Sequence, residues 1–176
     1  MDDAALLLGF ITLQRLAELV LAAHNTSRLR AQGASEFGQS HYPVMVTFHA
    51  AWLASLWWFG WKQPVHLGFF ALFVLLQGLR LWVIASLGSR WTTRVIVLPG
   101  ASLIRRGPYR WLRHPNYVVV ALEIAIVPLA LGLPVIAALF SILQVPLLLH
   151  RMAIETAALT WATSRTPEPI SPEATN

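Results

Sequence analysis

The hydrophobic positions of this chain gather in long, nearly uncharged runs rather than in alternating or one-sided patterns. The runs cover about 4–23, 43–59, 66–87, 117–131 and 134–149. A run of about 20 apolar residues is long enough to cross ~30 Å of hydrocarbon as a helix. Because lipid offers the backbone no hydrogen-bond partners, spans of this kind are helical. The pattern predicts an all-α integral membrane fold with about five transmembrane helices.

The last two runs are separated only by Gly132, Leu133 and Pro134. So short a connection predicts a hairpin of two short antiparallel helices. The chain is expected to form a single membrane-embedded domain over 1–162. The polar, proline-rich segment 163–176 is expected to be a disordered cytoplasmic tail.

Composition agrees with a membrane protein. Of the 176 residues, 56% are hydrophobic and only 12% are charged, whereas about a quarter of a soluble domain is charged. This excludes an ordinary soluble globular domain. The absence of cysteine excludes disulfides, thiolate metal sites and cysteine nucleophiles. The six histidines show no tight ligand spacing, so no metal site is expected.

The basic residues predict an orientation in the membrane. Segment 88–116 carries six arginines and no acidic residue, and segment 24–42 adds Arg28 and Arg30. Because Lys and Arg are enriched in cytoplasmic loops, we expect these segments and the C-terminus in the cytoplasm and the N-terminus outside. This topology also accounts for the net charge of +5, so no nucleic-acid partner is expected.

Four charged residues fall inside the predicted spans, where each is costly unless it is paired or hydrated. They are Arg15, Glu18, Arg80 and Glu123. With His49, they are expected in one layer near the cytoplasmic ends of the spans, where they would line a polar cavity. The alternative is structural: Arg15 pairs with Glu18 three residues away, and Arg80 bridges to Glu123.

Two further stretches carry candidate chemistry. In GPYRWLRHPNY, at 107–117, two prolines restrict the backbone and favour a structured loop. The loop would present Tyr109, Arg113, His114, Asn116 and Tyr117 at the mouth of the fourth span. Its arginines could instead simply bind lipid phosphates.

The second stretch is HRMAIETAAL, where Arg151 and Glu155 share one helical face. They form either a surface ion pair or two opposite charges aimed at one ligand. The chain contains no GxGxxG, P-loop or GxSxG motif, which excludes the corresponding nucleotide-binding and hydrolase sites.

These motifs together resemble a known family. GPYRWLRHPNY, a hairpin of short spans, and then Arg151 and Glu155 resemble the isoprenylcysteine carboxyl methyltransferase family over about 80–162. The wider group includes phospholipid N-methyltransferases. Segment 33–49 is similar to a small bacterial branch, some members of which methylate phenolic or pyrone lipids. A bacterial inner-membrane location is therefore expected.

The resemblance implies a methyltransferase that uses S-adenosyl-L-methionine and acts on a lipophilic small-molecule or lipidated acceptor in contact with membrane lipid. O-methylation of an isoprenylcysteine carboxylate or a phenolic or pyrone lipid is favoured. The alternatives are phospholipid N-methylation, a membrane sterol-type reductase and a non-catalytic lipid-binding relative. Oligomeric state is left open by the sequence.

The resemblance also assigns residues, with the cofactor part at about 88–162. The implied cofactor contacts are Ala101, Ser102, Leu103, Ile104, Tyr109, His114, Pro115, Asn116, Tyr117 and Glu155. Ala101-Ser102 replaces a His-Thr pair found in some eukaryotic members, and Arg94 falls near another polar cofactor contact. Arg151 would face the acceptor group.

The chemistry of the acceptor decides whether a base is needed. A carboxylate is already nucleophilic and needs only positioning, for example by Arg151. A phenol or enol must lose its proton. His114, Glu123, Glu18 and His49 remain alternative candidates for that base, and Arg151, His114 and Glu123 are the expected catalytic residues.

Overall fold

The protein is a helical bundle in the computed structural model, which describes residues 3–164. Its long helices are α1 (Asp3–Ala31), α2 (Tyr42–Gly60), α3 (Leu67–Leu87), α4 (Pro115–Ala130) and α5 (Pro134–Ser164). The short elements are strands β1 (Ser35–Phe37) and β2 (Val95–Val97) and the 3-10 turns Gln39–His41, Gly88–Arg90 and Gly107–Arg110. The predicted, mostly helical fold is confirmed, with one small antiparallel sheet formed by β1 and β2.

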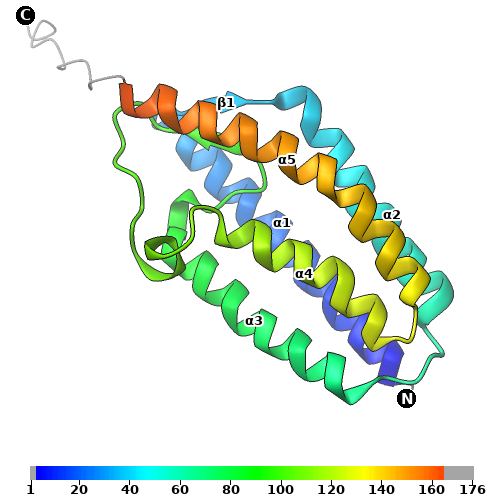
Figure 1. The fold of residues 1–176 in the computed structure, drawn as a ribbon. Helices are drawn as coiled ribbons and strands as arrows, with labels where there is room; N and C mark the ends of the chain where they lie inside the picture. Colours follow the sequence, from blue (N-terminus) through cyan, green and yellow to red (C-terminus); the bar gives the residue numbers. More distant parts are fainter. Residues whose placement is uncertain (1–2, 165–176) are drawn as a thin grey trace, which may run out of the picture.

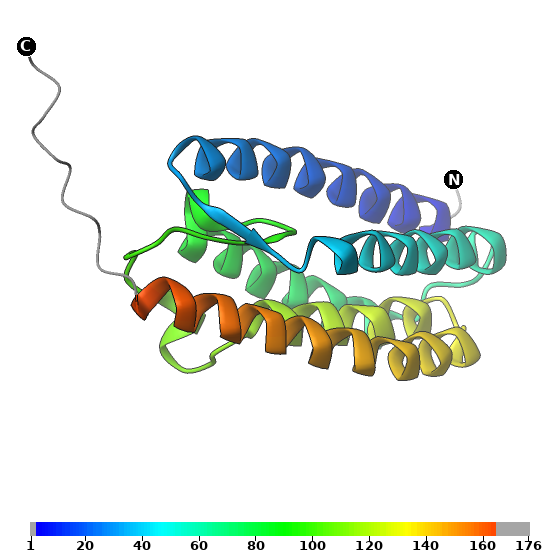
Figure 2. The ribbon, with the colours of Figure 1, turned by 90° about the horizontal axis from the view of Figure 1, so that it is seen from above.

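The helices lie side by side along one long axis (Figures 1 and 2). One end of the bundle holds the N-terminus of α1, the α2–α3 connection and the tight α4–α5 turn. The other end holds β1, β2, the irregular segment 98–114 and the C-terminal part of α5. The motifs singled out in the sequence therefore gather at one end of the molecule.

Two helices run farther than the hydropathy pattern predicts. Helix α1 continues to Ala31, and α5 continues to Ser164. Hydropathy marks only the apolar part of a helix, whereas the alanine-rich segment after Arg151 keeps a strong helical propensity in polar surroundings. The predicted start of the tail is thus wrong by two residues, because Thr163 and Ser164 are helical. The rest of that tail, 165–176, lies outside the described residues.

Within residues 3–164, three helical stretches are long and apolar enough to cross a membrane, namely Asp3–Ala31, Leu67–Arg90 and Pro134–Ser164. Helix α4 is apolar but has only 16 residues. Many large apolar side chains point outward; for example, Trp58 and Leu67 are each 79% exposed. An apolar exterior of this kind suits contact with lipid. These features support an integral membrane protein, while five crossings and their orientation stay predictions.

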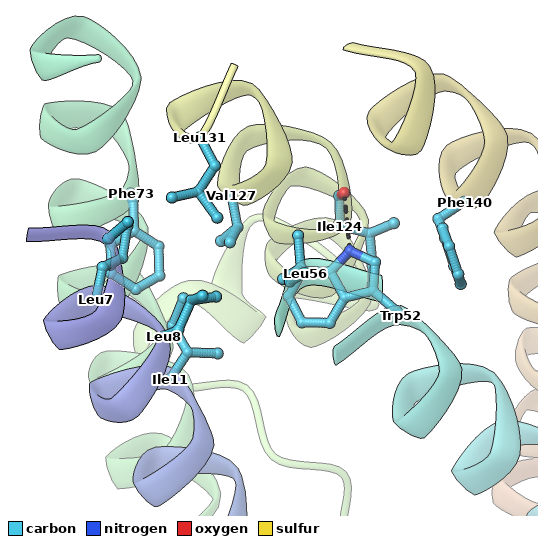
Figure 3. Close-up of a cluster of buried hydrophobic side chains, with 11 residues drawn as sticks. Leu7, Leu8, Ile11, Trp52, Leu56, Phe73, Ile124, Val127, Leu131 and Phe140 are labelled. Carbon is cyan, nitrogen blue, oxygen red and sulfur yellow. Dashed lines mark hydrogen bonds between the residues drawn. The ribbon is translucent and has the colours of Figure 1, made fainter. Parts of the chain in front are cut away.

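The apolar core lies toward the end that holds the N-terminus of α1. It joins all five long helices through side chains drawn in Figure 3: Leu7, Leu8, Ile11, Trp52, Leu56, Phe73, Ile124, Val127, Leu131 and Phe140. Trp52 also donates from Nε1 to the carbonyl of Ile124 at 3.3 Å. The indole is 1% exposed and satisfies its one polar group there, so it fixes α2 against α4.

The charges inside the helices form one buried cluster. Arg15 contacts Glu18 at 3.1 Å and Glu123 at 2.6 Å. Arg80 contacts Glu18 at 2.9 Å and donates from Nε to Glu123, also at 2.9 Å. Gln77 adds a bond of 2.8 Å to Glu123. Both predicted ion pairs are confirmed, but they belong to a single neutral cluster that ties α1, α3 and α4 together.

Candidate functional site

Local packing fixes the loop that leads into α4. Gly107 has a φ of +58°, and a Cβ there would overlap the hydroxyl of Ser86 and lie 3.0 Å from the Trp82 indole nitrogen. Only glycine fits such a position without strain. Arg106 donates from Nε to the Ser86 carbonyl at 2.8 Å. The loop is thereby held against the end of α3, and Pro115 then opens α4 as its first helical residue.

Four predicted site residues meet around one phenol oxygen. The Tyr117 hydroxyl donates to the Glu155 carboxylate, and Arg151 donates from Nε to the same hydroxyl at 3.0 Å. Arg151 also donates from Nη2 to the Thr93 carbonyl at 2.8 Å. The His114 ring stacks on Tyr117, and its Nδ1 lies 3.5 Å from Glu155. Arg151 and Glu155 are therefore linked through Tyr117.

A cavity of about 520 Å³ adjoins this group, between β2, segment 98–105 and the C-terminal part of α5; both polar and apolar side chains line it, and we call it the polar cavity because it holds the charged and hydroxyl groups of these segments. Its lining includes most of the predicted cofactor contacts: Ala101, Ser102, Leu103, Ile104, Tyr109, His114, Asn116, Tyr117 and Glu155. Pro115 does not line it and is fully buried. Arg94 does line it, as do other arginines of segment 88–116.

An apolar cavity of about 280 Å³ also borders Tyr117 and Arg151 of this group and lies mainly between α1 and α2. Its apolar lining includes Leu16, Leu19, Met45, Val46, Trp52, Leu53, Val120 and Leu148. The two cavities share five residues, Trp91, Thr92, Asn116, Tyr117 and Arg151. The Tyr117–Arg151 pair therefore stands where a polar and an apolar compartment meet.

The candidate bases do not all line the same cavity. His114 lines the polar cavity, whereas His49 and Glu18 line the apolar one. Glu123 lines neither of these two cavities and is only 1% exposed. Both arginines of the buried cluster contact it. The structure thus does not bring Glu123 together with the other predicted catalytic residues, Arg151 and His114.

Sequence reasoning missed the part played by β1 and β2. Glu36 of β1 pairs with Arg30 and, at 2.6 Å, with Arg94, whose guanidinium lies 4.0 Å from the Tyr42 ring. Burial opposes ionisation, but the hydrogen bonds and charges of Arg94 and Arg30 hold the pKa of Glu36 below its usual range. This ion pair fixes one wall of the polar cavity. Its partners are far apart in sequence, and no local pattern indicates them.

The C-terminal part of α5 also contributes more than expected. Thr156, Leu159, Thr160 and Thr163 line the polar cavity along with Glu155. Their spacing of three to four residues places them on one helical face. The sequence shows this spacing, but it lies after the apolar run, where a polar helical face was not expected.

Tyr109, on the loop that faces α5, keeps its hydroxyl protonated. Burial and then the charge of Glu155 raise its pKa well above the usual value.

Comparison with known proteins identifies the family. The sequence pattern of the isoprenylcysteine carboxyl methyltransferase (ICMT) family matches residues 68–161. The chain is also 39% identical over 167 residues to "Uncharacterized protein YpbQ" of Bacillus subtilis (strain 168), covering 88% of this chain and 95% of that protein. No solved structure matches the chain significantly. The matched region contains α4, most of α5 and the Tyr117–Arg151–Glu155 group, and the chain belongs to the isoprenylcysteine carboxyl methyltransferase family, a family of membrane methyltransferases.

Proposed function

We propose that the protein uses S-adenosyl-L-methionine to methylate an oxygen of a lipophilic acceptor. One observation carries this proposal: a polar and an apolar cavity share Asn116, Tyr117 and Arg151. A soluble, charged cofactor suits the polar cavity, and an acceptor with a hydrocarbon tail suits the apolar one. The methyl group would cross at the shared residues.

The polar cavity fits the charged groups of the cofactor. Among residues 3–164, Asn116 Oδ1 is buried without a hydrogen-bond partner, and His114 Nδ1 has the Glu155 carboxylate only at 3.5 Å; both residues line this cavity. Buried polar atoms in folded proteins are nearly always paired, so such atoms at a cavity wall suit a polar ligand. Glu155 offers a carboxylate for the cofactor's ammonium or hydroxyl groups, and Arg94 offers a cation for its carboxylate.

When bound, S-adenosyl-L-methionine supplies an activated methyl group on a sulfonium. Arg151 is held by its bonds to Tyr117 and Thr93, which use Nε and Nη2. Its remaining nitrogen, Nη1, is then available to orient an anionic acceptor oxygen. The apolar walls exclude water from the transfer region. Alignment and exclusion of water are the main requirements of such a transfer.

The charge of the site favours an oxygen acceptor over an amine. The apolar cavity is bordered by Arg15, Arg80 and Arg151, and its one carboxylate, Glu18, is already paired with two of these arginines. An ammonium headgroup would meet Arg151 without a free carboxylate to offset the repulsion. A carboxylate, a phenolate or an enolate would meet a complementary charge.

Titration calorimetry tests whether the protein binds the proposed cofactor. We expect the detergent-purified protein to bind S-adenosylhomocysteine, the demethylated product, at micromolar concentration. Glu155→Gln should weaken binding by at least tenfold, because the carboxylate is lost while the side-chain size is kept. Asp3→Asn, at the far end of α1, is the matched control and should leave the affinity unchanged. No binding to a well-folded sample would overturn the proposal.

A further inference from the structure

One hydrogen bond fixes a proton on a particular ring nitrogen of His49, on α2. Its Nδ1 lies 2.8 Å from the carbonyl oxygen of Met45. A carbonyl can only accept a hydrogen bond, so Nδ1 must carry the proton. In a neutral imidazole the other nitrogen, Nε2, then has a free lone pair. The His49 ring also packs edge-on against Phe48 at 5.4 Å between centroids, and this contact limits its rotation.

The ring lines the apolar cavity that Arg151 and Tyr117 also line. In the stretch 3–164, no hydrogen-bond partner is found for Nε2. A proton acceptor therefore borders an apolar cavity without an internal partner. A hydroxyl on a ligand in that cavity would satisfy it.

The other titratable groups named here around the cavity already form ion pairs or hydrogen bonds with other residues, or cannot accept a proton. Glu18 from α1 is paired with Arg15 and with Arg80 from α3. Tyr117 from α4 donates its hydroxyl hydrogen bond to Glu155, and Arg151 from α5 is a cation with no acceptor capacity. Of these titratable groups, only His49 is neutral, basic and unpaired on its ligand-facing side.

We propose that His49 is the general base that takes the proton from an acceptor hydroxyl placed between His49 and Arg151. This inference rests on the proposed function and assigns a catalytic role to a residue of α2. The Nε2 lone pair takes the hydroxyl proton, which leaves an oxyanion facing Arg151. The oxygen forms a bond to the methyl carbon as the carbon–sulfur bond breaks. The electron pair of the broken bond stays on sulfur. The imidazolium then releases its proton to water.

The acid strength of the acceptor explains the need for a base. A phenol with a pKa near that of tyrosine, about 10, is ionised in only about one molecule in a thousand at pH 7. A positioned base typically contributes about 10²- to 10⁴-fold to such a step. A carboxylate acceptor is fully ionised at pH 7 and gains nothing from His49. The two acceptor classes therefore predict different consequences of removing the imidazole.

The test measures transfer of a labelled methyl group by the detergent-purified wild type and His49→Asn. Asparagine keeps a donor for the Met45 carbonyl and removes the base. The acceptors are an alkylphenol and an alkyl nitrophenol with the same tail, the second being ionised near pH 7. We expect His49→Asn to lower kcat for the alkylphenol by about 10²- to 10⁴-fold and to change kcat for the nitrophenol far less. Affinity for S-adenosylhomocysteine, measured by calorimetry, should be unchanged.

Two controls sharpen the result. His24→Asn removes an exposed imidazole from α1 outside both cavities and should behave as the wild type. In the wild type, kcat for the alkylphenol should rise with pH to a plateau as His49 loses its proton, and the plateau should be reached well below about pH 10, where the phenol itself ionises. A rise that instead follows the ionisation of the phenol would overturn the assignment, and this measurement needs no variant, so it applies even if His49→Asn and His49→Gln fail to fold.

Each outcome bears on the inference. Equal losses with both phenols, or no loss at all, would overturn the assignment of His49 as base. Methylation of fatty carboxylic acids but of neither phenol would overturn it while leaving the proposed methyltransferase function intact. A wild type that neither binds S-adenosylhomocysteine nor methylates any acceptor would overturn both.

Discussion

Arg151 donates from Nε to the phenol oxygen of Tyr117 at 3.0 Å, joining α5 to α4 where the two cavities meet. The residues are 34 positions apart in sequence. The Tyr117 hydroxyl donates a hydrogen bond to Glu155, so one hydroxyl links the residue proposed for the acceptor to the residue proposed for the cofactor. Substitutions of Arg151, Tyr117 and Glu155 should therefore have different effects, which can be measured separately.

Arg151→Lys should abolish most turnover. Lysine keeps the charge but lacks the planar fork that bonds Tyr117 and Thr93 while leaving Nη1 free. We expect kcat/KM for the acceptor to fall by roughly 100-fold, equivalent to about 2.7 kcal/mol. S-adenosylhomocysteine affinity should change less than threefold. Arg28→Lys, on an exposed turn of α1, serves as the control. A comparable loss of cofactor affinity would place Arg151 in the cofactor site instead.

Tyr117→Phe should weaken cofactor binding moderately. Removing the hydroxyl deprives both Glu155 and Arg151 of a partner while preserving the ring that stacks on His114. Loss of one such bond at a charged group costs about 1.5–3 kcal/mol, or roughly a tenfold to hundredfold loss. Calorimetric titration measures this directly. An affinity equal to that of the wild type would separate Tyr117 from the cofactor.

Glu123→Gln should reduce stability rather than chemistry. The change leaves Arg15 and Arg80 without one of their two carboxylates in a buried cluster. Breaking a buried pair costs about 3–5 kcal/mol. We expect the thermal midpoint in detergent to fall by several degrees, with Asp3→Asn unchanged. If activity is lost at an unaltered midpoint, Glu123 has the catalytic role expected from the sequence.

The link between Glu36 and Arg94 predicts a dependence of stability on pH. The pKa of Glu36 is lowered in the folded protein from its ordinary value of 4.5. The unfolded chain therefore binds more protons in this range, and the stabilisation is full above about pH 4.5 and is lost as pH falls through the folded pKa. The thermal midpoints of the wild type and Glu36→Gln should differ at pH 7 and converge toward pH 3. A difference that grows on acidification would contradict this sign.

The sequence predicted the elements that carry local signals. Apolar runs located the long helices, and Arg151 with Glu155 indicated a shared helical face through their spacing alone. The resemblance of GPYRWLRHPNY and the following hairpin indicated that His114, Tyr117 and Glu155 belong to one site. The structure places these three in contact.

The rest depended on contacts between distant segments. The pairing of Glu36 with Arg94 requires two three-residue strands, which are too short to leave a pattern. The joining of two predicted ion pairs into one cluster depends on how α1, α3 and α4 are rotated. The same is true of His49, because its place at the apolar cavity and the ion pairs that occupy Glu18 distinguish it from the other candidate bases.

The most direct test of the account is transfer of a labelled methyl group from S-adenosyl-L-methionine, by the protein in detergent, to an alkylphenol. We expect a labelled methyl ether from the wild type, and at least 100-fold less from Arg151→Lys and His49→Asn. His24→Asn should give the same yield as the wild type. A folded wild type that binds the cofactor product yet labels no phenolic, carboxylic or amine lipid would contradict the central claim.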